Sequence, residues 1–448
     1  MGIASAFYTA LSGLSVNSAS LSVIGNNLAN LNTIGFKGSS TTFQDLFSTN
    51  LGASPFQGNG NPCQVGLGAQ VGAVMQNFGQ STFQSTSNPL DMALQGNGFF
   101  YVRALNGNNN YAHTRAGNFT VNPFGFVVDP SGNRLQGYNR DAAGKIDTTL
   151  GSSDIKLPIG ETVVARSTER ISFTTNLDAN AVSMTNNARY TSPIRVYDSL
   201  GTQHNVLITY DKLSNNQWAY YVWSPDSVPL TSAPTLPATL GGGNTIAEGT
   251  LDFNNDGSLN AITRMVDGDL GTVGTDVNPQ FSISWSNGSA SNNITWEINT
   301  SLPGGTPKFK ITQVDSAPGT SDSSQDGYGA GTVMGLTVDQ NGFIIGTFTN
   351  GQTYALAQVA LSIFTNNHGL QKIGENLWKE TIASGPSNVG TAGDLGRGQV
   401  LGAHYEMSNV DVADEFTRLI ITQRGYQANS RIVTTSDEMM QETLSLKR

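Results

Sequence analysis

The sequence predicts a mainly β protein whose two ends form paired terminal α-helices. Apolar residues recur every seven positions at both ends of the chain, which is the spacing of a helix that packs along a partner. Between the ends, short apolar runs are separated by glycine and polar residues, which is typical of antiparallel strands. Short strand-like runs occur before residue 148, a second β-rich region follows, and short strand-like runs occur again after residue 321. We therefore expect discontinuous, nested domains, with coiled-coil-like terminal helices and two antiparallel β domains.

The C-terminal stretch from 408 to 448 carries the longer helical stripe. One column of this stripe is apolar throughout, and it consists of Val412, Leu419, Tyr426, Val433 and Met440. The interleaved column is polar in its middle, and it consists of Phe416, Gln423, Ser430, Asp437 and Leu444. Ser408 and Asp411 resemble a capping box, so we expect the helix to begin near Asn409. A stripe of this length needs a partner.

The N-terminal stretch offers a similar stripe. Its apolar column is Phe7, Leu14, Leu21 and Leu28, and the interleaved column is Leu11, Ser18, Gly25 and Asn32. Ser, Asn, Gly and Thr are weak helix formers, so both helices need burial to be stable. They could pack on one globular domain, or they could pair with each other and with neighbouring subunits. The predicted assembly interface contains Phe7, Leu11, Leu14, Leu21, Leu28, Val412, Phe416, Leu419, Tyr426, Val433, Met440 and Leu444.

Composition excludes several classes of function. A chain of 448 residues suggests two to four domains. A net charge of −10 without a basic run argues against a nucleic-acid surface, so we expect a protein partner. Cys63 is the single cysteine, which excludes an internal disulfide and is interpreted as an incidental thiol. No basic residue precedes Lys37 and no apolar run is long enough to span a bilayer. We therefore expect no membrane insertion, and either a cytoplasmic protein or one that uses a specialised export system.

The middle of the chain divides into segments by composition. Asn, Thr and Gly at 29–37 predict a helix stop and a change of direction, and the polar stretch 48–72 predicts a linker or extended arm. The Gly/Ser/Asp-rich run 317–331 predicts the end of the outer β region. The predicted domains are a helical assembly domain (1–34 and 402–448), connecting arms (35–88 and 365–401), an inner β domain (89–147 and 322–364) and an outer β domain (148–321).

Strand candidates follow from β-branched and aromatic enrichment between turn residues. In the inner domain they are 98–102, 119–121, 126–128, 135–138, 335–338, 342–345 and 356–364. In the outer domain they are 170–173, 194–197, 205–210, 218–223, 249–253, 280–285, 294–298 and 308–314.

A search for catalytic chemistry is negative. The four histidines lack metal-ligand spacing, and no hydrolase, redox or nucleotide-binding motif is present beyond a loose glycine pattern at 66–72. The stretch from Asp252 resembles a calcium loop, but its twelfth position is Thr263 instead of a glutamate. We interpret it as a polar hairpin turn. The sequence predicts no cofactor, no metal and no catalytic residue.

Both ends of the chain resemble one known family. Ala29-Asn30-Leu31-Asn32-Thr33-Ile34-Gly35-Phe36-Lys37 looks like the N-terminal signature of bacterial flagellar rod and hook proteins, the axial proteins of the flagellum. Ser408-Asn409-Val410-Asp411 and the stretch 423–430 look like the family's closing signature. The motif residues are Asn30, Asn32, Thr33, Gly35, Phe36, Lys37, Ser408, Asn409, Val410, Asp411, Gln423 and Tyr426. The stretches 95–100 and 114–119 are similar to the family's shared β domain.

Length and the large outer region resemble hook subunits more than the shorter distal rod proteins. The resemblance implies a structural homopolymer, a curved tube that acts as a universal joint between rod and filament. It also implies contacts with the distal rod, the hook cap, the hook-filament junction proteins and the flagellar type III export apparatus, and export without a cleaved signal peptide. A distal rod protein is the alternative within the family. An exported adhesin or glycan-binding β-sandwich is the alternative from another class, and an enzyme comes third.

Overall fold

The computed structural model describes residues 2–50, 64–104, 110–141, 144–183, 188–228, 245–266, 269–273, 278–300 and 308–445. They form two compact units, of which the first contains residues 1–157, 335–346 and 353–448 and the second contains residues 158–334 and 347–352. Most of the described secondary structure is strand, with one long helix near each end of the chain. The predicted fold class, mainly β with terminal helices, is confirmed at this level. Cys63 lies outside the described residues.

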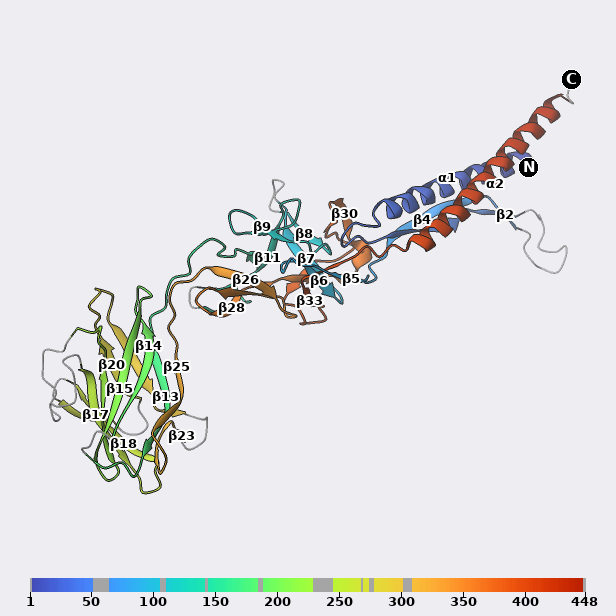
Figure 1. Ribbon diagram of the computed structural model, residues 1–448. Helices are drawn as coiled ribbons and strands as arrows, with labels where there is room; N and C mark the ends of the chain where they lie inside the picture. Colours follow the sequence, from blue (N-terminus) through green and yellow to red (C-terminus); the bar gives the residue numbers. More distant parts are fainter. Residues whose placement is uncertain are drawn as a thin grey trace. The chain divides into compact units, whose positions relative to one another are not determined.

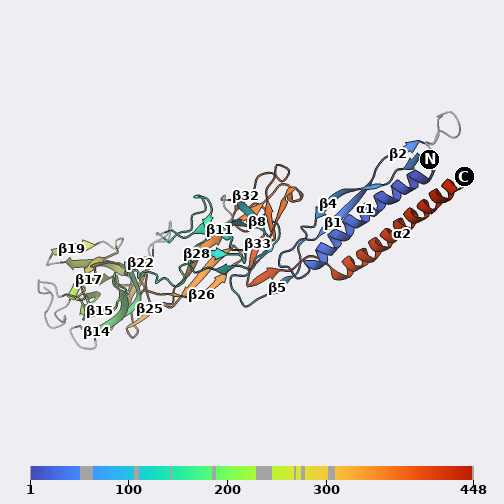
Figure 2. The same ribbon diagram turned by 90° about the horizontal axis from the view of Figure 1, so that it is seen from above.

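The two long helices are α1 (Gly2–Ala29) and α2 (Val412–Ser445). They lie side by side in both views of the first unit (Figures 1 and 2). Asp411 caps α2, because its Oδ1 accepts hydrogen bonds from the backbone N–H groups of Ala413 (2.8 Å) and Asp414 (3.2 Å). The predicted start near Asn409 with Ser408 in a capping box is therefore wrong. The carbonyl oxygen of Ser408 instead accepts a bond from the Ser81 hydroxyl (2.8 Å), which holds this segment outside the helix.

A two-stranded antiparallel ribbon lies against α1 in the stretch expected to be a connecting arm. Its register runs from Ser39 opposite Gln76 to Asp45 opposite Ala69. The hydroxyl groups of Thr41 and Ser20 are 3.2 Å apart, which joins ribbon and helix. The strands here are β1 (Ser39–Asp45), β2 (Ser48–Asn50), β3 (Gln64–Gly66) and β4 (Ala69–Gln76). Regular pairing therefore occupies part of the predicted linker, whose residues 51–63 lie outside the described part.

The remaining strands of the first unit form a thirteen-stranded sheet with two small two-stranded sheets beside it. Its main path runs β26-β27-β28-β11-β7-β8-β31-β30. The strands from the first half of the chain are β5 (Phe83–Ser85), β6 (Met92–Gln95), β7 (Phe99–Arg103), β8 (Tyr111–Thr114), β9 (Thr120–Val121), β10 (Val127–Val128), β11 (Arg134–Asn139) and β12 (Ser153–Asp154). Those from the second half are β26 (Val333–Val338), β27 (Phe343–Phe348), β28 (Thr353–Val359), β29 (Leu361–Ile363), β30 (Gln371–Gly374), β31 (Leu377–Lys379), β32 (Asn388–Gly390), β33 (Gln399–Gly402) and β34 (His404–Glu406). A short 3₁₀ helix, η2 (Asn367–Gly369), lies between β29 and β30.

The Gly/Asn-rich stretch 384–398 is held against this sheet. Strand β32 pairs with β29, and the buried Arg397 donates from Nη2 to the side-chain Oδ1 of Asn388 at 2.6 Å. Part of the predicted connecting arm 365–401 is therefore paired with the sheet.

The second unit contains two main sheets that share one core, together with a small two-stranded sheet of β22 and β23. One sheet runs β14-β15-β16-β17-β18-β19, and the other runs β20-β21-β13-β24 with β25 beside β13. Tyr220 of the first sheet and Trp296 of the second meet edge to face with ring centres 5.4 Å apart. The strands are β13 (Arg170–Asp178), β14 (Arg189–Tyr197), β15 (Gln203–Ser214), β16 (Gln217–Trp223), β17 (Thr245–Phe253), β18 (Leu259–Val266), β19 (Asp269–Val273), β20 (Gln280–Ile283), β21 (Asn292–Glu297), β22 (Asn299–Thr300), β23 (Lys308–Phe309), β24 (Ile311–Val314) and β25 (Gly319–Gln325).

Two expectations for the second unit need correction. Strand β13 pairs in parallel with β21 and with β24, so the unit is not purely antiparallel. Parallel pairing needs a long crossover, and the intervening strands of the other sheet provide it. The run 317–331 is also more than a boundary, because β25 within it pairs with β13. The expected polar turn after Asp252 is confirmed, since it joins the antiparallel strands β17 and β18.

A cluster around the buried carboxylate of Asp198 ties three loops of the second unit together. His204 Nε2 lies 3.1 Å from Asp198 Oδ2, His204 Nδ1 lies 3.3 Å from Asp226 Oδ2, and the His204 ring stacks on Trp285. Burial alone would raise the pKa of Asp198. Hydrogen bonds from Asn287, His204 and two backbone N–H groups outweigh burial and lower this pKa to about 2.

We expect the second unit to lose stability as the pH falls through the range in which Asp198 becomes protonated. The folded pKa of Asp198 lies below its ordinary value of 3.8, so its contribution is complete above about pH 4 and is lost progressively toward pH 2. Melting temperatures measured across this window test the expectation. Asp198→Asn should have a shallower pH dependence than the wild type, and an unchanged slope would contradict the assignment.

Candidate assembly site at the paired termini

The two sequence signatures meet in the structure around one buried carboxylate. Glu406 Oε1 lies 2.7 Å from Lys37 Nζ, and both side chains are fully buried. Arg115 Nη1 reaches the other oxygen, Glu406 Oε2, at 3.4 Å. Burial lowers the pKa of Lys37 and that of Arg115, while the Glu406 charge opposes this shift in both. The cluster joins the segment after α1, the segment before α2 and the central sheet.

Backbone groups complete this cluster. The backbone N–H of Ser81 donates to Glu406 Oε1 (2.8 Å), and Lys37 Nζ donates to the carbonyl oxygen of Gly79 (2.9 Å). The N–H of Gly35 donates to the carbonyl oxygen of Glu406 (2.8 Å). Gly35 has φ +68° and its Cα faces the backbone of Ala116, so a Cβ there would lie 2.5 Å from the Ala116 nitrogen. Only glycine fits this position, which explains one letter of the N-terminal signature.

The other signature residues make separate local contacts. Asn409 Oδ1 accepts from the backbone N–H of Gly38 (2.8 Å), and its Nδ2 donates to the carbonyl oxygen of Asn77 (2.7 Å). Thr33 Oγ1 donates to Asn30 Oδ1 (3.1 Å) in the turn after α1. Of the rest, Phe36 and Ser408 are buried, Val410 is half-buried, Asp411 caps α2, and Asn32, Gln423 and Tyr426 are exposed.

The contact between α1 and α2 is made by glycine and side-chain amides. A Cβ on Gly13 would lie 2.6 Å from Asn429 Nδ2, and one on Gly425 would lie 3.2 Å from Asn17 Oδ1. Each glycine thus admits the asparagine of the opposite helix. Asn27 Nδ2 donates to Glu415 Oε1 at 3.1 Å nearer the sheet. This contact face runs through Glu415, Thr422, Asn429 and Ser436 on α2, and Thr422 and Ser436 are buried in it.

The predicted interface columns flank this face instead of forming its centre. The half-buried members are Phe7, Leu14, Leu21, Leu28, Leu419, Val433 and Met440. The exposed members are Leu11, Val412, Phe416, Tyr426 and Leu444. The residues that do form the contact, Gly13, Asn17, Gly425 and Asn429, were missed because they are not apolar. Small residues repeated at helical spacing were the available signal.

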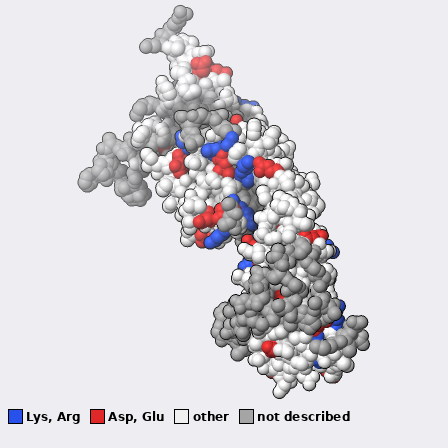
Figure 3. Space-filling model, turned by 90° about the vertical axis from the view of Figure 1, so that its left-hand side faces the viewer, with Lys and Arg blue, Asp and Glu red and all other residues white. Residues whose placement is uncertain are grey.

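Further apolar side chains are exposed around the helices. Ile421 is 65% exposed, Phe416 is 51% exposed and Phe43 on β1 is 49% exposed. On the face that Figure 3 shows, charged side chains are scattered among uncharged ones. The exposed apolar side chains around the helices are suited to burial against other protein.

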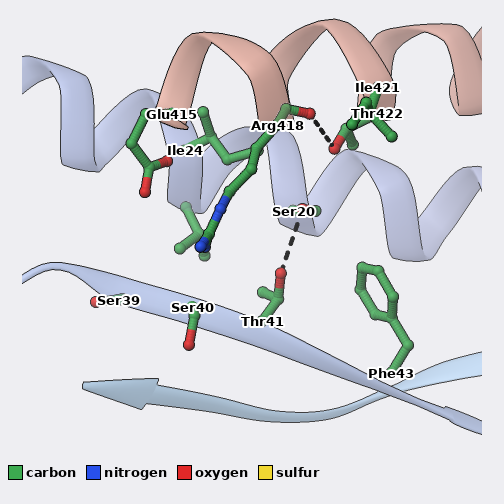
Figure 4. Close-up of a pocket in the computed structure, with 11 residues that line it drawn as sticks. Ser20, Ile24, Ser39, Ser40, Thr41, Phe43, Glu415, Arg418, Ile421 and Thr422 are labelled. Atoms are coloured by element: carbon green, nitrogen blue, oxygen red, sulfur yellow. Dashed lines mark hydrogen bonds between the residues drawn. The ribbon is translucent and has the colours of Figure 1, made fainter. Parts of the chain in front are cut away.

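A cavity of about 150 Å³ lies between α1, α2 and β1. Figure 4 shows Arg418 reaching from α2 toward β1, and Phe43 pointing up from β1. Arg418 Nη2 pairs with Asp414 Oδ2 at 2.9 Å. Glu415 also lines the cavity, and it is 7% exposed.

The described residues contain no group of three or more His, Cys, Asp or Glu placed to hold a metal ion. None of the described helices is both long and apolar enough to cross a membrane.

Four family models match the chain. They are "Flagella basal body rod protein" (residues 7–37), "Flagellar hook protein FlgE/F/G D1 domain" (93–185), "Flagellar basal body protein FlaE D2 domain" (168–328) and "Flagellar basal body rod FlgEFG protein C-terminal" (402–446). The first and last of these contain the two signatures that meet at Glu406.

Whole-length relatives are also found. The flagellar hook protein FlgE of Treponema pallidum is 34% identical, with 98% of this chain and 99% of the relative covered. That of Salmonella typhimurium is 30% identical, with 98% and 100% covered. The crystal structure of Helicobacter pylori flagellar hook protein FlgE2 matches 71% of this chain and 98% of its own, with a TM-score of 0.50 and 14% identity, which indicates a shared fold.

Proposed function

Because the chain belongs to the flagellar hook protein family and is a structural subunit of the hook, we propose that its copies polymerise into a flexible, curved tube. This tube is the universal joint that transmits motor torque from the rod to the filament. The observation that carries the proposal is the exposed apolar surface of α2 and the β1–β4 ribbon, which a neighbouring copy would cover. Head-to-tail contacts between different surfaces of one chain do not close on themselves, so they generate a helical filament.

We propose that the paired helices line the inside of the tube and that the β units lie outside them. The predicted assembly interface belongs to this inner layer, where half-buried residues such as Leu14 and Leu419 would become fully covered. The proposal keeps the nested domains predicted from the sequence. We propose that the outer domain at 148–321 adjusts the curvature of the tube and does not build the tube itself.

The location in the flagellar hook follows from the family, and the finer interactions are proposals. We propose contacts with the distal rod, the hook cap and the hook-filament junction proteins at the two ends of the tube. Export would proceed through the flagellar type III apparatus without a cleaved signal. We further propose that the protein has no enzymatic activity and needs no cofactor.

Electron microscopy of basal bodies from a strain that lacks this gene tests the function. The deletion should leave rods without hooks, and a plasmid copy should restore curved hooks. Truncated rods would point to the distal rod alternative. Intact hooks in a non-adherent strain would point to an exported adhesin.

A further inference from the structure

We propose that Glu415 is the receptor for Arg424 of a second copy of this chain, an inference that rests on the proposed function and names one contact within it. One carboxylate oxygen of Glu415 lacks a hydrogen-bond partner among the described residues. Glu415 Oε1 receives a bond from Asn27 Nδ2 (3.1 Å), but Glu415 Oε2 is buried and has no hydrogen-bond partner among the described residues. A buried carboxylate oxygen without a partner is costly. Its retention beside a cavity of about 150 Å³ indicates that a donor enters from outside.

The chemistry of the cavity defines this donor. Its walls combine Glu415 and Arg418 with serine and threonine hydroxyl groups and with apolar side chains that include Ile24 and Phe43. A guanidinium fits such a site, because it donates several hydrogen bonds in a plane and tolerates apolar neighbours. A water molecule would supply the missing hydrogen bond but would bring no positive charge, and the Arg418 guanidinium in the wall already pairs with Asp414.

Within the described part of the terminal region, few basic groups are free to fill this role. Helix α1 has no charged residue, and Lys37 is occupied by Glu406. Helix α2 supplies Arg418, Arg424 and Arg431. Arg418 pairs with Asp414, whereas Arg424 and Arg431 are exposed and have no ion pair within the part of the chain that the structure describes.

Arg424 cannot reach Glu415 of its own chain without unwinding α2. It follows the contact residue Thr422 by two positions, about 200° around the helix, so it stands on the face turned away from α1. Ile420, which is 51% exposed, lies about one turn from it. A neighbouring copy that placed this face on the cavity would bring Ile420 toward Phe43 and the guanidinium toward Glu415. The two surfaces differ, as a growing helical polymer requires.

Charge reversal tests the pairing in full-length protein expressed in the deletion strain. Glu415→Arg should abolish hooks and motility, whereas Glu415→Gln, which keeps the bond to Asn27, should impair them less. Glu415→Arg combined with Arg424→Glu should restore hooks. Rescue of Glu415→Arg by Arg431→Glu would show that Arg431, the other arginine of this face, is the partner of Glu415. Rescue of Glu415→Arg by Arg418→Glu would show that Glu415 pairs with Arg418 of its own chain. Either result, or normal hooks from Glu415→Arg, would overturn the proposal.

Cysteine cross-linking gives a readout that does not depend on charge. In a Cys63→Ser background, Glu415→Cys with Arg424→Cys should form disulfides between subunits, visible as a ladder of covalent oligomers from oxidised hooks. Each single cysteine should give no ladder, and a double variant without one would contradict the contact. If the unsubstituted gene itself restores no hooks, the proposed function fails. If it restores hooks but the paired variants show no coupling, only this inference fails.

Discussion

Replacing Glu406 by alanine is expected to destabilise the first unit by about 3–5 kcal/mol. The substitution removes the carboxylate that faces Lys37 and Arg115, and it leaves both cations buried without their counter-charge. It also removes the acceptor for the backbone N–H of Ser81. Urea unfolding followed by circular dichroism measures the effect, since the transition of the first unit should move to lower urea concentration.

The second unit and an exposed ion pair serve as controls for Glu406. The transition of the second unit should not move, because the cluster lies wholly in the first. Asp414→Ala breaks the pair with Arg418, which has a distance of 2.9 Å but is about half exposed, and should cost no more than about 1 kcal/mol. Equal losses from Glu406→Ala and Asp414→Ala would show that burial of the cluster contributes little.

Replacing Leu419 by aspartate is expected to abolish hook assembly. Leu419 lies on α2 and is half-buried in the single chain. We propose that it becomes fully covered in the tube. An unpaired carboxylate there costs several kcal/mol or must be protonated. The cost recurs in every subunit, so export of the variant without hooks, and without motility, is the expected phenotype.

The matched control for this position is Leu419→Met, which conserves volume and should assemble. The unfolding transition of the second unit should be the same in both variants, because Leu419 belongs to the first unit. Normal hooks from Leu419→Asp would place this residue on a free surface. A large loss in unfolding free energy of the isolated subunit would instead show that α2 belongs to a globular core.

Local patterns were sufficient to predict some of the strands in both units, whereas others, such as β8, β18 and β31, were not predicted. Trp218–Trp223 and Ile194–Tyr197 alternate or cluster apolar residues between turns, and β16 and β14 occupy these positions. Pairing partners were not predictable in the same way. The parallel pairs of β13 join residues more than a hundred positions apart in sequence, and no local pattern encodes such a partner.

The candidate site was predicted in its location but not in its detail. Heptad spacing indicated that both ends are helical, and the signatures around Lys37 and Ser408 marked the segments that meet at Glu406. The helix contact itself depends on how closely two backbones approach, through Gly13 and Gly425, and on asparagines that fill the space. A search for apolar residues at heptad spacing overlooks both the glycines and the asparagines. The orphan oxygen of Glu415 likewise becomes visible only when the neighbours of its carboxylate are known.

The position of Glu406 has a mechanical consequence. Its carboxylate holds Lys37 from the N-terminal segment and Arg115 from the sheet, while its own backbone continues into the C-terminal helix. Tension applied to either helix therefore reaches the same carboxylate, in addition to the separate strand pairing of β34 with β5 and of β1 with β4. Loss of this carboxylate would weaken the anchorage of both arms at once. In a rotating joint, the two arms of a subunit would share part of each load.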